Sequence, residues 1–153
     1  MPVDRATAVE LKRLRRLIDG WAQRALDDNP LLAAVDRDPA LDRWYVRLRG
    51  EEKQVVTLWL TLRELTLQFE TYFMPAPEEE PARCYEYLLR ANARMFGWRF
   101  AIGAEDAVYL VGQLPLSSVD EEELDRVVGS GLAYSDRYFV PAMRIGYASR
   151  FPR

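Results

Sequence analysis

The stretch VVTLWLTLRELTLQFETYFM, residues 55–74, predicts two antiparallel β-strands joined by a tight turn. Its first part, residues 55–62, is rich in β-branched and aromatic side chains, which favour a pleated strand. Its second part, residues 65–73, alternates apolar with polar side chains, so Leu67 and Phe69 are expected to share one face. Only two residues separate the two parts, which leaves room for no more than a short turn. This pair forms the centre of the predicted sheet.

The sequence before this pair predicts a third strand and a long helix. Residues 44–49 alternate in the same way and form the third strand of an antiparallel meander. Residues 4–28 carry apolar side chains at three- and four-residue spacing, which indicates an amphipathic helix. Pro30 ends this helix, because the residue before a proline avoids the α region. We expect residues 31–35 to add one more helical turn, so that residues 1–36 form an N-terminal helical extension.

The sequence after the pair predicts a helix, a hairpin and a final helix. The second helix spans residues 81–95, and the hairpin pairs residues 98–102 with residues 107–111. Ser118 is expected to cap the last helix, with Glu121 completing a capping box. The order α-β-β-β-α-β-β-α describes a two-layer α+β domain, in which helices cover one face of an antiparallel sheet of about five strands. We assign all 153 residues to this single domain.

The composition limits the chemistry available to the chain. Its net charge of −3 argues against a general nucleic-acid binder, because such domains are usually basic. With no histidine and one cysteine, Cys84, it lacks the residues for imidazole catalysis, for Cys-His nucleophiles and for the usual zinc sites. The acidic runs at residues 78–80 and 120–123 do not have the alternating spacing of a calcium loop. We expect no catalytic residue, no metal and no cofactor, although carboxylate-only chemistry stays open.

The location of the protein is also constrained by its sequence. No stretch approaches the ~20 apolar residues that span a bilayer. The N-terminal residues lack the layout of a secretory signal, because Asp4 and Glu10 interrupt them. A single cysteine is typical of a reducing compartment. We therefore expect a cytoplasmic protein without membrane contacts.

Several segments carry a family resemblance. They are FETYFMP (residues 69–75), YLLRAN (87–92), FAI (100–102), VYLV (108–111), LPL (114–116) and EEELDRVV (121–128). Together with the element order, they resemble the YbjN family of bacterial sensory transduction regulators, whose fold is like that of type III secretion chaperones. The resemblance covers about residues 44–140, and the arginine-rich composition is similar to that of actinobacterial proteins.

The resemblance implies a function without chemistry. The family has no catalytic motif, and its chaperone relatives bind extended segments of client proteins, usually as homodimers. A non-catalytic protein-binding adaptor or chaperone-like regulatory protein, acting as a homodimer, is the function implied here, although fold alone is a weak guide to function. The alternative is a small-molecule-sensing regulatory domain with a ligand pocket between the sheet and the helices.

Three aromatic residues are the candidates for partner binding. Strand alternation places Trp59, Tyr72 and Tyr109 on the sheet face opposite the apolar positions that meet the helices. Aromatic side chains on a half-polar face are enriched at protein interfaces, so this face is a candidate partner or dimer surface. The alternatives are that the first or last helix covers the three residues, or that they are singly exposed aromatics without a role.

Other residues admit a structural and a functional interpretation. Asn92 either bonds to the backbone of the following turn or contacts a ligand. The basic run at residues 13–16 either faces solvent or contacts an acidic partner. Cys84 is either a buried, inert side chain or a thiol of lowered pKa at a helix start. In each case the structural interpretation is the expected one.

Overall fold

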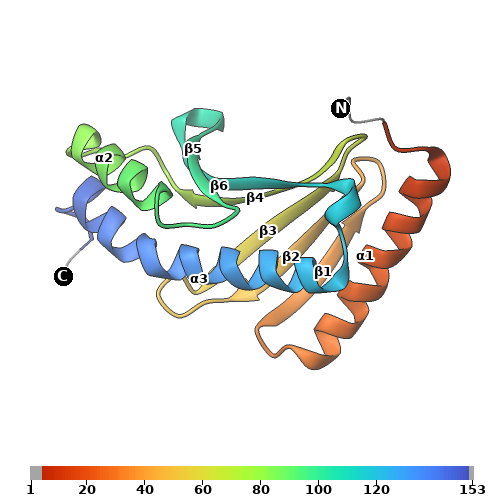
Figure 1. Cartoon of the computed structure of the whole chain (residues 1–153). Coiled ribbons are helices and arrows are strands. Elements are labelled where there is room, and N and C mark those ends of the chain that lie inside the picture. The colour runs from red at the N-terminus through yellow and green to blue at the C-terminus, as the bar shows by residue number, and fades with distance from the viewer. Residues whose placement is uncertain (1–4, 152–153) are drawn as a thin grey trace.

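The computed structural model describes residues 5–151 as three α-helices and one antiparallel sheet of six strands. The helices are α1 (Ala8–Asp28), α2 (Pro81–Asn92) and α3 (Glu121–Gly146). The strands are β1 (Leu32–Asp38), β2 (Arg43–Arg49), β3 (Val55–Leu62), β4 (Thr66–Met74), β5 (Arg99–Ile102) and β6 (Val108–Pro115). They are ordered β1-β2-β3-β4-β6-β5 across the sheet, and every neighbouring pair is antiparallel (Figure 1). The predicted α+β class is confirmed.

The sheet has one strand more than predicted, because residues 32–38 form β1. The predicted helical turn at residues 31–35 is wrong, and so is a purely helical extension over residues 1–36. Val35 of β1 lies opposite Val46 of β2 in an antiparallel register. Cross-strand pairing along the whole of β2 outweighs the weak helical preference of a short segment that is rich in leucine and alanine.

The inner face of the sheet packs against α1 and α3, and Figure 1 shows α3 crossing that face. The largest fully buried side chains of the sheet are Trp44, Leu48, Leu58, Leu60, Leu67, Phe69, Phe73, Met74 and Leu110, and those of the helices are Leu14, Ile18 and Leu124. These residues form one continuous core, which confirms helices on one face of the sheet. No helix among residues 5–151 combines the length and the apolar character needed to cross a membrane.

Helix α1 is tied into this core by polar contacts. Asp42, in the turn between β1 and β2, accepts hydrogen bonds from Nε of Arg15 at 2.9 and 3.0 Å and from Nη2 of Arg37 at 2.6 Å. Burial alone would raise the pKa of Asp42, but the bonds from the two guanidinium groups outweigh it and lower this pKa below its usual 3.8. Trp44 donates its indole N–H to Asp19 of α1 at 2.8 Å. The helix is therefore an integral part of the domain.

The helix ends follow local capping chemistry. Thr7 caps α1 in a capping box with Glu10, and the predicted helix start at Asp4 lies outside the described residues. The predicted cap of α3 at Ser118 is wrong by two residues. Asp120 is the cap, because its carboxylate accepts the backbone N–H of Glu123 at 2.8 Å.

The sheet opens between β3 and β4 at one end. Their register runs only from the Leu58–Thr71 pair to the turn, whereas β3 continues to pair with β2 as far as Val55. Strand β4 likewise continues to pair with β6 as far as Met74. The two strands therefore diverge, as Figure 1 shows, and the Thr71 hydroxyl donates to the carbonyl of Thr57 at 2.7 Å where the ladder stops. This opening positions the candidate site.

Candidate functional site

The three aromatic residues predicted for partner binding lie on the outer face of the sheet. Trp59 is 37% exposed, Tyr72 is 46% exposed and Tyr109 is half-buried. Helices α1 and α3 pack on the opposite face, so the predicted alternative of a helix lying over Trp59 and Tyr72 does not hold. Strand alternation alone was enough to place these side chains correctly.

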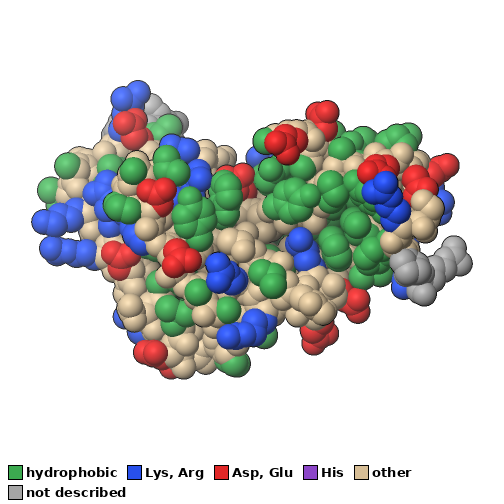
Figure 2. Space-filling view, turned by 180° about the vertical axis from the view of Figure 1, so that it is seen from behind, with side chains coloured by type: hydrophobic (Ala, Val, Ile, Leu, Met, Phe, Trp, Pro, Cys, Tyr) green, Lys and Arg blue, Asp and Glu red, His purple; other side chains and the backbone are tan. Residues whose placement is uncertain are grey.

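The structure brings all three residues together in one cleft of about 450 Å³. The cleft is lined by Lys53, Val55, Thr57, Trp59, Glu70, Thr71, Tyr72 and Tyr109. It lies where β3 and β4 diverge, so neighbouring strands wall it on both sides. Figure 2 shows this outer face, where hydrophobic side chains gather in patches between charged ones. The cleft thus joins aromatic surface to a break in the sheet.

Neighbouring side chains hold the aromatic rings in fixed orientations. The Tyr72 and Tyr109 rings meet edge to face, with centroids 5.7 Å apart, and Tyr45 packs in the same way on Trp59 at 5.5 Å. The guanidinium of Arg43 lies 4.6 Å from the Trp59 ring centroid. Rings that are already ordered lose less conformational entropy when they bind, which suits a recognition surface.

Lys53 lines the cleft, and sequence reasoning assigned it only to the turn between two strands. Its ammonium nitrogen lies 5.5 Å from the Tyr72 ring centroid and 5.0 Å from that of Phe139 on α3. Burial lowers the pKa of the Lys53 amine below its usual 10.5. None of the ion pairs among residues 5–151 includes Lys53. A lysine in a polar turn is normally solvated, so the sequence carried no signal of this placement.

A carboxylate on α3 fixes the turn that carries Lys53. Asp136 accepts the backbone N–H groups of Glu51, Glu52 and Lys53, each at 3.1 Å. Gly50 opens this turn, and a Cβ there would lie 2.1 Å from the carbonyl oxygen of Lys53. The turn is therefore clamped to the helix layer, and Lys53 is held at the end of the cleft.

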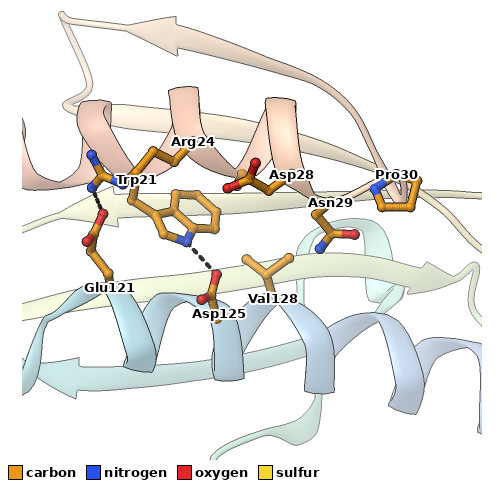
Figure 3. Close-up of a pocket in the computed structure, with 9 residues that line it drawn as sticks. Trp21, Arg24, Asp28, Asn29, Pro30, Glu121, Asp125 and Val128 are labelled. Carbon is orange, nitrogen blue, oxygen red and sulfur yellow. Dashed lines mark hydrogen bonds and ion pairs between the residues drawn. The ribbon is translucent and has the colours of Figure 1, made fainter.

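A second hollow, of about 440 Å³, lies between α1 and α3 (Figure 3). Trp21 of α1 donates its indole N–H to Asp125 of α3 at 2.8 Å, and Arg24 pairs with Glu121. Its volume falls within the range of small-molecule sites. However, these four side chains bind one another across the hollow, as Figure 3 shows, instead of converging on a central point. The arrangement fastens α1 to α3 and gives little support to the alternative of a small-molecule sensor.

The remaining candidates have structural roles. Asn92 accepts the backbone N–H of Phe100 at 2.7 Å and donates to its carbonyl at 3.4 Å, which joins α2 to β5. Cys84 is buried, and burial raises the pKa of its thiol. Arg15, in the basic run, contacts a carboxylate of the chain itself, Asp42. Within residues 5–151, no cluster of three or more Cys, Asp and Glu side chains could hold a metal ion.

An apolar groove of about 340 Å³ runs between α2 and the edge strand β5. Its lining residues are Tyr85, Leu88, Leu89, Phe100, Ala101, Ile102 and Val108. Leu89 and Ile102 are 67% and 57% exposed, so the groove presents apolar surface beside an edge strand that pairs only with β6. Such an edge is a potential site for further strand pairing.

Comparison with known proteins identifies the family. The model of YbjN, described as "Putative bacterial sensory transduction regulator", matches residues 21–141. An uncharacterised protein of Mycobacterium tuberculosis is 34% identical over 108 residues, which are 71% of this chain and 59% of that protein. An uncharacterised protein of Mycobacterium leprae is 31% identical over 107 residues, 70% of this chain and 58% of that protein. The chain therefore spans less than two thirds of the length of these relatives.

Solved structures with a similar fold include type III secretion chaperones. A chain of the HopA1-SchA chaperone-effector complex matches with a TM-score of 0.61 and 13% identity, covering 88% of this chain and 98% of that one. A chain of the complex of the Yersinia pestis type III secretion chaperone SycH with a stable fragment of YscM2 matches with a TM-score of 0.54 and 17% identity, covering 80% and 96%. A chain of the ExsC-ExsE complex gives 0.58 and 16%, covering 84% and 92%. At these identities the likeness establishes the fold, as the sequence predicted.

Proposed function

The chain belongs to the YbjN family, and we propose that it is a non-catalytic, chaperone-like adaptor that binds a segment of a partner protein on the outer face of its sheet. One observation carries this proposal. Trp59, Tyr72 and Tyr109, which are far apart in the sequence, line a single cleft where the sheet opens. Aromatic side chains clustered in a pocket are the type of residue that dominates binding energy at interfaces.

The physical basis of binding is apolar burial combined with main-chain pairing. The side chain of Val55 is 60% exposed beside Trp59 and Tyr72, so a docked segment would remove apolar surface from water. At the same end of the cleft, residues 55–57 of β3 have no register partner on β4. An extended segment of a partner suits such an opening, because its backbone can pair with a strand while its side chains contact the rings.

The fold comparison supports this proposal without settling it. HopA1-SchA is described as a chaperone-effector complex, and SycH was solved in complex with a fragment of YscM2. A shared fold is an analogy for function, because one fold can serve many functions. The proposal therefore rests first on the cleft of this chain.

We further propose that two copies of the chain associate through the groove between α2 and β5. Leu89 and Ile102 would then be covered by the partner copy, and the edge of β5 would be protected from unspecific pairing. Leu89→Glu should convert a concentration-dependent dimer into a monomer in analytical ultracentrifugation. A monomeric wild-type chain at all concentrations would exclude this part of the proposal.

The buried, unpaired Cys84 is compatible with a cytoplasmic location.

Site-specific photo-crosslinking in cells of the source organism tests the adaptor function. Benzoylphenylalanine would replace Trp59 or Tyr72, and in a matched control it would replace Val9, which is 78% exposed on α1. We expect discrete adducts with another protein at positions 59 and 72 and not at position 9. Adducts that are absent, or equal at all three positions, would contradict the proposed docking face.

A further inference from the structure

We propose that Lys53 binds a carboxylate of the partner, so that the docked segment is an extended strand with a single Asp or Glu side chain among apolar residues. This inference rests on the proposed docking function and specifies the chemistry of its occupant. It assigns a role to a residue that the aromatic surface alone does not explain.

The position of Lys53 calls for an anionic neighbour. Its ammonium lies against the rings of Tyr72 and Phe139 rather than extending into solvent, and none of the ion pairs among the described residues involves it. Ring faces compensate only part of the cost of removing an ammonium from water. A carboxylate that enters the cleft would accept a charge-assisted hydrogen bond from this half-buried ammonium.

The charges around Lys53 restrict the kind of acidic segment that fits. Glu70 lines the same cleft, and Glu51 and Glu52 are exposed on the turn before Lys53. The Asp136 carboxylate faces the turn as well, but it is engaged by three backbone N–H groups. An acidic tract would be repelled by these carboxylates, whereas one acidic side chain between apolar residues meets Lys53 and the rings together.

The opening of the sheet favours an extended protein segment as the occupant. The amine of Lys53 lies near Tyr72, at the end of the cleft where β3 and β4 no longer pair. A strand that pairs with residues 55–57 projects every second side chain toward the same face, which places one of them beside this amine. The carboxylate is thereby presented by the same backbone that fills the opening.

A library of displayed random 12-residue peptides tests this inference with the full chain. Peptides are selected on the wild-type protein, and those that still bind a Trp59→Ala variant are discarded. We expect the remaining peptides to share one Asp or Glu flanked by apolar residues. Changing that residue to Asn or Gln should weaken binding about tenfold or more, as should Lys53→Met in the protein.

The losses of affinity from the peptide substitution and from Lys53→Met should not add, because each change removes the same contact. Lys53→Arg should retain more affinity than Lys53→Met, and urea unfolding of both variants checks that the fold is kept. The chain has only two lysines, Lys12 and Lys53, so ¹³C-methylated lysine spectra show Lys53 as one of two side-chain signals. Adding a selected peptide should shift the Lys53 signal and leave that of Lys12 in place.

Each other outcome is informative. Peptides that require Trp59 but bind Lys53→Met equally well would overturn the carboxylate site and leave the docking function intact. Finding no peptide that depends on Trp59 would overturn both. A third outcome is that dimerisation of the chain displaces the peptides while Lys53→Met leaves their affinity unchanged. That result would identify a second copy of the chain as the occupant and would also overturn this inference.

Discussion

Replacing Asp136 by alanine should destabilise the domain by about 2 kcal/mol. The carboxylate accepts three backbone N–H groups of the turn between β2 and β3, each at 3.1 Å. Hydrogen bonds to a charged group contribute about 1.5–3 kcal/mol when shielded, but Glu51 and Glu52 are exposed, so we assign about 0.5–1 kcal/mol to each bond. For a chain of this size the loss corresponds to a fall in Tm of about 4–8 °C.

Urea unfolding followed by tryptophan fluorescence measures this loss. The midpoint should fall with an unchanged m-value, because the surface exposed on unfolding stays the same. Arg144→Ala, an exposed position on the same helix, is the control and should change the free energy by less than about 0.5 kcal/mol. A loss equally small for Asp136→Ala would refute the idea that this carboxylate clamps the turn.

Three further predictions concern other parts of the molecule. In α3, Gly129→Ala should stabilise the fold by about 0.5–1 kcal/mol, because a Cβ at this position meets nothing within 4 Å. Gly131→Ala should instead destabilise the fold by about 1–3 kcal/mol, because a Cβ there lies 2.6 Å from the Trp98 ring. Thermal unfolding of the two variants compares these effects. Because the pKa of Lys53 is lowered from 10.5, its side chain binds more protons in the unfolded chain than in the folded one just below that pH. The stability of the wild type relative to Lys53→Met should therefore rise with pH there, as urea titrations of both proteins at several pH values would show. Because the pKa of Asp42 is lowered from 3.8, the contribution of its carboxylate to folding stability is complete above that pH and is lost as the pH falls through the lower folded-state pKa. The difference in stability between wild type and Asp42→Ala should therefore shrink in acid. A constant difference would contradict the role of the two arginines.

Local pattern was sufficient for much of the fold. The meander and the hairpin follow from alternation within each strand, and the same alternation fixed the face on which Trp59, Tyr72 and Tyr109 lie. Successive side chains of a strand point to alternate faces of the sheet, so the face of each residue can be predicted without knowing the neighbouring strands. The structural role of Asn92 was also predictable, because a polar side chain on an apolar stripe must find a backbone partner.

The rest depended on tertiary contacts that a local pattern does not contain. Residues 32–38 form a strand because β2 offers an edge for pairing, which their own composition does not reveal. The cleft exists because β3 and β4 diverge, a property of the whole twisted sheet. Lys53 faces aromatic rings because Asp136, 83 residues away in the chain, fixes its turn. The sequence predicted the face on which the aromatic residues of the candidate site lie, and it gave no signal that Lys53 lines the same cleft.

The opening between β3 and β4 is expected to receive a segment of a partner protein. Hydrogen–deuterium exchange tests this directly when the chain alone is compared with the chain in complex with the partner that crosslinking identifies. Amides of residues 55–59 and 70–74 should exchange more slowly in the complex, while those of β1 should not change. Slower exchange confined to α2 and β5, or no change in any strand, would contradict the account.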